Sequence, residues 1–146
     1  MRFFFEHLSS VLLIGFLGWF ISGDIFCIPS ALIAGWCIDL DHLCDFLLYT
    51  IKSKKLNLSL VRTGQYFKIN KRIIVPLHSW ELSFLLLLLG VLIPEHRAPL
   101  VVASLAHGMH LLQDQRGYHV RTFGYSLISR INKGFAYHGF CRDDND

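Results

Sequence analysis

The chain has 146 residues, of which 53% are hydrophobic and 17% are charged, and its formal net charge is +3 at pH 7. This composition excludes an average water-soluble domain, in which about 25% of residues are charged. The length allows one domain, and the long apolar segments predict an all-α, polytopic membrane protein.

Four apolar segments approach the length of about 20 residues that a bilayer-crossing helix needs. They cover residues 8–22, 25–38, 73–93 and 98–112, and the second could extend to residue 51. The first carries no signal-peptide cleavage pattern, so we expect it to stay attached. One or two shorter segments could instead be re-entrant. The predicted fold is a four-helix transmembrane bundle in residues 1–114, followed by a short amphipathic cytoplasmic tail in residues 115–146.

The distribution of positive charge predicts the topology. Seven of the 14 Lys and Arg residues lie between the second and third segments, where no acidic residue occurs from Phe46 to Trp80. Loops rich in Lys and Arg remain in the cytoplasm, so we predict a multi-pass inner-membrane protein with both termini cytoplasmic. The basic loop could also attract anionic membrane lipids, although a purely topological role is the simpler interpretation.

An acidic cluster directly follows the second apolar segment and contains Asp39, Asp41, His42 and Asp45. A carboxylate in an apolar segment is costly unless it is paired, protonated or bound to a cation. In a helix, spacings of three and four residues would place these side chains on one face. We interpret this face as a set of ligands. The alternative is a helix N-terminus whose dipole the acids complement.

The predicted topology brings ionisable residues of the other segments to the same membrane depth. They are His7, His78, Glu81, His107, His110 and Asp114. Imidazole and carboxylate together suit zinc, manganese or iron, and helical bundles build sites for one or two such ions from facing helices. We therefore predict a divalent metal, zinc first, at the cytoplasmic membrane face. The candidate ligands are His7, Asp39, Asp41, His42, His78, His107, His110 and Asp114.

Four motifs recur in this order: an N-terminal His, a D-x-D-H motif ending the second segment, a His-Ser pair in the third, and H-x-x-x-D closing the fourth. In this order the chain resembles the LexA-binding, inner membrane-associated metal-dependent hydrolases over residues 7–114. The resemblance implies metal ligation or its immediate support by His7, Asp39, Asp41, His42, His78, Ser79, His110 and Asp114.

The chain departs from that family in three places. Ile38 stands where the family typically has Pro before the first Asp, and Ile73-Ile74-Val75 replaces a His-Arg-Gly sequence before the second His. Glu81 and His107 are additions. These departures indicate a divergent member with its own way of handling substrate.

Three functions fit these residues. The first is a hydrolase in which metal-activated water is the nucleophile, with Glu81 or Asp45 as general base and a lipid-like or phosphoester substrate. The second is a noncatalytic metal-binding or metal-transport protein, and the third is a haem-binding electron carrier. Transport would need a polar path to the outer face, which the apolar outer halves of the segments lack, so the hydrolase is preferred.

The tail interleaves aromatic and basic residues, among them Arg121, Phe123, Tyr125 and Arg130. This composition is typical of an interfacial helix on a membrane surface, so we predict membrane lipids and no nucleic acid as partners. The cysteines form no C-x-x-C motif and indicate no disulfide framework.

Overall fold

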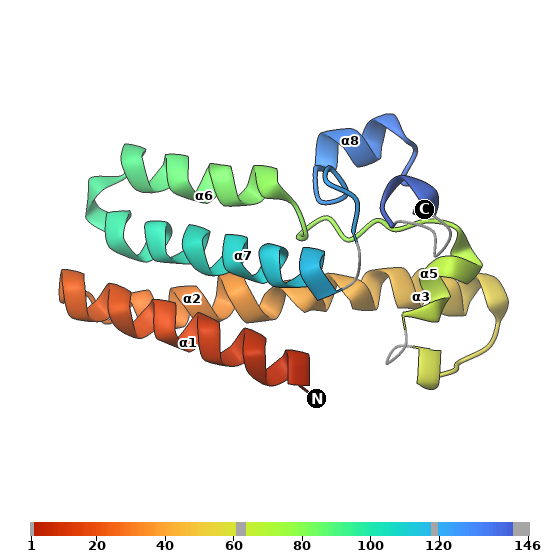
Figure 1. Cartoon of the computed structure of the whole chain (residues 1–146), viewed down its shortest axis with the longest axis horizontal. Coiled ribbons are helices and arrows are strands. Elements are labelled where there is room, and N and C mark those ends of the chain that lie inside the picture. The colour runs from red at the N-terminus through yellow and green to blue at the C-terminus, as the bar shows by residue number, and fades with distance from the viewer. Residues whose placement is uncertain (1, 61–63, 118–119, 142–146) are drawn as a thin grey trace.

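The computed structural model describes residues 2–60, 64–117 and 120–141 and is all-α, as predicted, with no strand in these ranges (Figure 1). The long helices are α1 (Arg2–Ser22), α2 (Cys27–Trp36), α3 (Asp41–Ser53), α6 (Trp80–Leu92) and α7 (Arg97–Gly117). Short elements connect or follow them: η1 (Cys37–Leu40), α5 (Gln65–Asn70), η2 (Pro94–His96), α8 (Leu127–Asn132) and η3 (Tyr137–Gly139).

Helices α1, α2 and α7 pack on one another, and α6 packs against α7 (Figure 1). Their contact is close because small residues face each other. A Cβ atom at Gly35 would lie 2.6 Å from a methyl carbon of Val11 and 3.1 Å from Ala106. This close approach also brings the Gly35 carbonyl next to α7, where it accepts a hydrogen bond from His110.

The second predicted segment continues as one rod, because α2, η1 and α3 follow one another along the long axis (Figure 1). The third does not begin at residue 73. Residues 73–79 are extended or turned, and α6 starts only at Trp80, where the Ser79 hydroxyl accepts a hydrogen bond from the Leu82 amide. Pro76 lacks an N–H and disfavours a helical conformation at the residue before it.

By length and composition, α1 is one helix able to cross a membrane, through Phe5–Ser22. Trp80–Leu92 and Pro94–Gly117 pass the same criterion together, but they are bent by 118° at the break between them. The described helices therefore supply one or two candidate spans rather than the four predicted, because α2 has 10 residues and α6 has 13.

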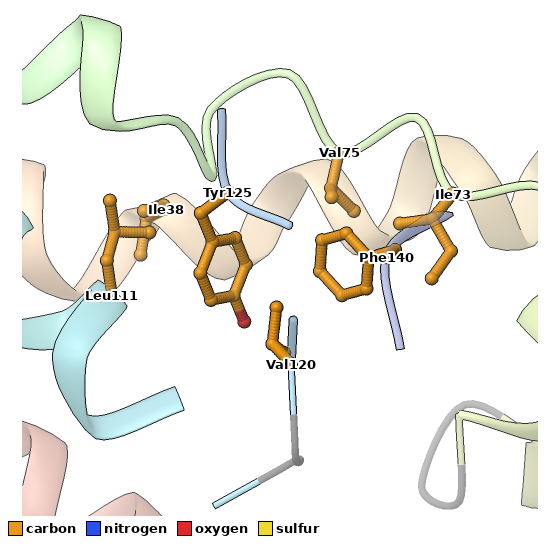
Figure 2. Packing of buried hydrophobic residues seen from close by; sticks show 7 residues of the cluster. All are labelled: Ile38, Ile73, Val75, Leu111, Val120, Tyr125 and Phe140. Atoms are coloured by element: carbon orange, nitrogen blue, oxygen red, sulfur yellow. The ribbon is translucent and has the colours of Figure 1, made fainter. Parts of the chain in front are cut away.

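The tail is packed against the extended segment. Single antiparallel bridges join Arg72 to Ala136 and Val120 to Cys141, and residues 118–119 and 142–146 of the predicted tail lie outside the described ranges. A buried core unites the tail with earlier elements (Figure 2); it contains Ile38, Ile73, Val75, Leu111, Val120, Tyr125 and Phe140. The tail therefore packs next to the layer of ionisable residues that the sequence predicts at the ends of the helices.

Candidate metal centre

Two histidines and two aspartates converge where η1, the extended segment and α7 meet. Donor atoms of Asp39, His78, His110 and Asp114 lie within 4.8 Å of one another, and we call them the four-donor group. His78 Nε2 lies 3.4 Å from Asp39 Oδ1 and 3.5 Å from Asp114 Oδ2. His110 Nε2 lies 3.5 Å and 3.3 Å from the same oxygens. The group could therefore hold a metal ion.

The other nitrogen of each ring fixes its orientation. His78 Nδ1 lies 3.0 Å from Asp41 Oδ1, and His110 Nδ1 lies 2.8 Å from the Gly35 carbonyl oxygen, so each Nδ1 carries the proton that it donates. Acceptors of this kind hold metal-binding histidines in one tautomer, with Nε2 free to ligate.

Among the residues that the structure describes, both Nε2 atoms are buried and make no hydrogen bond of acceptable geometry, although carboxylate oxygens lie 3.3–3.5 Å away. A buried nitrogen without a partner is destabilising. A cation between the rings and the carboxylates would satisfy both nitrogens and neutralise both acids. The residues present therefore fit a divalent ion.

Asp39 differs from the other three donors in the exposure of its side chain. The side chains of His78, His110 and Asp114 are 1%, 1% and 7% exposed, whereas that of Asp39 is 56% exposed. Three donors thus come from the interior, and the fourth is exposed at the surface.

The extended segment is held to α3 by its amides. Asp41 accepts hydrogen bonds from the amides of Leu77 and His78, at 2.8 and 3.3 Å. Asp45, one turn later, accepts from the amides of Ile74 and Val75, both at 3.0 Å. These carboxylates replace the partners that a helix would have provided to the amides.

Arg130 holds the carbonyls of the same segment. Its guanidinium donates to the oxygens of Ile74 and Val75 at 2.8 Å each and of His78 at 2.7 Å, and the residue is 3% exposed. The main chain that carries His78 is therefore fixed from both sides, by α3 carboxylates and by a tail cation.

Replacing Arg130 with methionine should lower the free energy of unfolding by about 2–3 kcal/mol, because three carbonyls, two of them in buried hydrogen bonds, lose a charged donor. Denaturant unfolding measures this loss. Arg116→Met is the matched control, since Arg116 is an exposed residue at the end of α7. Equal loss in both variants would show that Arg130 does not fix the segment.

His7 and His42 flank the four-donor group. His7 Nε2 lies 3.1 Å from Asp114 Oδ1, the oxygen that points away from the two central histidines. His42 Nε2 lies 3.7 Å from Asp39 Oδ1, and its Nδ1 lies 3.3 Å from the Tyr66 hydroxyl. His42 also forms a second, overlapping set of possible ligands with Asp41 and His78. Both predicted ligands therefore lie beside the centre rather than within the four-donor group.

His107 is engaged elsewhere. Its Nδ1 accepts from the Ser83 hydroxyl at 2.6 Å, and its Nε2 donates to the Leu77 carbonyl at 2.9 Å. With both nitrogens occupied, His107 links α7 to α6 and to the extended segment, and neither set of possible ligands includes it.

Glu81 and Asp45, the predicted general bases, also contact main-chain groups. Glu81 accepts from the Ser126 hydroxyl at 2.7 Å and from the amides of Leu127 and Ile128 at 2.9 and 3.2 Å, which caps the start of α8. Asp45 binds the amides described above. The structure therefore places neither carboxylate among the donors of the four-donor group.

Two tail residues that the sequence did not indicate belong to the site. The Tyr125 hydroxyl donates to Asp114 Oδ2 at 3.3 Å, and its ring stacks on His78 with centroids 5.8 Å apart. Arg130 fixes the segment of His78. A single buried arginine in a mixed basic and aromatic tail shows no spacing that would reveal either role.

Burial lowers the pKa of His78, but the carboxylates of Asp114, Asp39 and Asp41 outweigh it and raise the pKa well above 6.5. The metal-free ring is therefore protonated at neutral pH. This charge stabilises the metal-free fold fully below pH 6.5, and the contribution is lost as pH rises through the higher folded-state pKa.

Metal binding must expel that proton. We expect the metal affinity to increase with pH above 6.5 and each bound ion to release at least one proton. Calorimetric titration in two buffers of different ionisation enthalpy measures the release. An affinity that is independent of pH, with no proton release, would contradict ligation by His78.

No protein-family model, curated protein or solved structure matches this chain. The resemblance to the inner membrane-associated hydrolases therefore stays a prediction from the motifs.

Proposed function

We propose that this chain is a membrane-embedded, metal-dependent hydrolase and a divergent member of the family that its motifs resemble. The observation that carries the proposal is that the Nε2 atoms of His78 and His110 are buried and oriented, make no hydrogen bond within the described ranges, and lie 3.3–3.5 Å from two carboxylates. A structural role in the core would have paired these nitrogens, as it pairs both nitrogens of His107.

The spacing of the donors is compatible with zinc, which we propose as the ion. Bonds of about 2.0–2.1 Å at tetrahedral angles put neighbouring donors about 3.3–3.4 Å apart, whereas an octahedral ion with bonds of about 2.1 Å puts them about 3.0 Å apart. The four distances between histidine nitrogens and carboxylate oxygens are 3.3–3.5 Å. We propose His78, His110 and Asp114 as the permanent ligands.

We propose that hydrolysis occurs at the fourth position of the metal, beside the exposed side chain of Asp39. A bound zinc ion supplies a water whose pKa it lowers to about 7. Asp39 can leave the fourth position to a small molecule because its side chain is 56% exposed, while the other three donors are enclosed. His42, whose side chain is 32% exposed and lies beside Asp39, is placed to accept a proton there. We propose His42 as general base in preference to Glu81 and Asp45.

Exposed apolar surface supports a location in a membrane. Large apolar side chains are exposed along α1 and α6. They include Phe20, Ile21, Phe84 and Leu92, which are 85%, 82%, 70% and 65% exposed. Contiguous apolar surface of this kind marks contact with lipid or with another protein. We propose that α1, the rod of α2 and α3, α6 and α7 together form an inner-membrane body with both termini in the cytoplasm.

A reporter fused after Asp146 or inserted at Asn57 should be cytoplasmic, and one inserted at Glu95 should be external, because positive charge is concentrated in the first two regions. Alkaline phosphatase and fluorescent-protein fusions measure the side. A cytoplasmic Glu95 would contradict the proposed topology.

The function is tested by turnover. Purified, zinc-loaded protein should hydrolyse at least one of a set of nitrophenyl phosphates and carboxylic esters, lose this activity with chelator and regain it with zinc. The His110→Ala variant should be inactive, and His96→Ala, at an exposed position in η2, should be active. Hydrolysis that survives chelation, or none with a fully occupied site, would overturn the proposal.

One observation favours a second candidate, a noncatalytic metal-binding protein. Closed sites with four protein ligands are typically structural, and four donors are present here. Asp39→Ala separates the two. A catalytic site held by three buried ligands keeps about one ion per chain in this variant, whereas a closed four-ligand site loses it.

A further inference from the structure

Asp39, the exposed donor of the metal centre, lies on an apolar face of the rod formed by α2, η1 and α3. Large exposed side chains recur there every three or four residues and thus follow one side of the rod. This α2–α3 stripe consists of Ile33, Trp36, Leu40, Leu43, Leu47 and Ile51, which are 40–73% exposed.

Asp39 interrupts this stripe. Of the nine exposed residues between Ile33 and Ile51, Asp39 is the only charged one. Trp36 and Leu43, three residues before it and four after it, are its neighbours on the surface of the rod. A molecule that reaches the exposed donor therefore meets apolar side chains on both sides of it.

The stripe ends in a group of cations. Lys52, Lys54 and Lys55 directly follow Ile51. Lysines at the end of an apolar helix face extend to the membrane surface and its headgroups. With the helices in a bilayer, as proposed above, the stripe would face acyl chains and its far end would reach the polar interface.

From this arrangement we infer that the substrate of the proposed hydrolase is a membrane lipid, which enters sideways from the bilayer, lays its apolar chain on the α2–α3 stripe and brings its polar head to the position of Asp39. This inference rests on the proposed function, because it needs a metal at the four-donor group. A water-soluble substrate would gain nothing from a rim of tryptophan and leucine.

The test uses cobalt as a coloured substitute for zinc in the full-length protein, reconstituted in phosphatidylcholine nanodiscs. Dodecyl phosphate and inorganic phosphate are the probes, and the visible bands of bound cobalt report entry of either at the ion. Dodecyl phosphate should change the spectrum at a total concentration at least about tenfold lower than inorganic phosphate, because its chain is removed from water.

Partition of dodecyl phosphate into the bilayer alone could produce that difference, so two matched variants isolate the stripe. Leu43 and Leu85 are both 48% exposed, but Leu85 lies on α6, outside the stripe. Leu43→Gln should raise the dodecyl phosphate concentration required by at least about fivefold, and Leu47→Gln should act in the same direction. Leu85→Gln should leave it at the wild-type value.

The outcomes separate the two proposals. If wild-type protein binds no cobalt, the proposed function fails. If cobalt binds but the two phosphates act at equal concentration, or Leu43→Gln and Leu85→Gln behave alike, the lipid inference fails and the metal site stands. A change in oligomeric state of Leu43→Gln without any change in the dodecyl phosphate response would assign the stripe to a second copy of the chain and also overturn the inference.

Discussion

Replacing His110 with alanine is expected to abolish metal binding and to lower the free energy of unfolding of metal-saturated protein by at least about 4 kcal/mol, the contribution of a ligand present at about 1,000 times its dissociation constant. The variant loses a buried nitrogen ligand and the hydrogen bond to the Gly35 carbonyl. It also leaves Asp39 and Asp114 close together without the cation that neutralises them.

Metal content by elemental analysis and unfolding with and without chelator measure both losses. His96→Ala is the control because His96 is exposed at the opposite end of α7. A histidine that merely fills the core would give a different pattern, in which His110→Ala lowers stability but the metal content per folded chain equals that of the wild type.

Replacing Asp41 with asparagine should weaken metal binding by about 10–100-fold, the usual effect of losing the carboxylate that orients a ligating histidine. An asparagine can still accept from the Leu77 amide, but it no longer fixes the tautomer of His78 through Nδ1. A competitive chelator titration measures the affinity.

Asp45→Asn provides the matched comparison one turn along α3. Asp45 accepts from the amides of Ile74 and Val75 and, in the described part of the chain, has no hydrogen bond to a histidine. Its substitution should change stability slightly and metal affinity by less than about threefold, since an amide oxygen still accepts both bonds. Equal weakening by the two substitutions would show that Asp41 only holds the main chain.

The sequence was sufficient to predict the helical class, the first helix and all four residues of the four-donor group. Asp39, His78, His110 and Asp114 were all candidates, because polar residues in apolar segments need compensation wherever they lie. Apolar length was also sufficient to locate the starts or ends of α1, α6 and α7 approximately. These features depend on local composition, which a sequence displays directly.

Residues 73–79 illustrate what composition could not decide. An apolar run such as Ile73-Ile74-Val75 suits a buried helix and a buried extended segment equally well. Its actual conformation depends on Asp41, Asp45 and Arg130, which come from distant parts of the chain. Pro76 was the local signal against a helix.

The prediction that Glu81 acts as general base depended on the expectation that residues 73–93 form one helix. A His78-x-x-Glu81 pair shares a face only if both residues lie in one helix. Ser79 instead has an extended conformation, with φ −141° and ψ 136°, and separates them. Glu81 consequently reaches α8, while His78 reaches the four-donor group. The partners of Glu81 in the tail could not be read from spacing along the chain.

The central claim is that His78, His110 and Asp114 hold one divalent ion in tetrahedral geometry, with Asp39 or a small molecule at the fourth position. X-ray absorption spectroscopy of the purified, zinc-loaded protein tests it most directly. The account predicts one zinc per chain, with four nitrogen or oxygen ligands at about 2.0 Å and the scattering pattern of two imidazoles, which falls to one or none in His110→Ala. Zinc without imidazole scattering, a six-coordinate shell, or an unchanged spectrum in His110→Ala would contradict it.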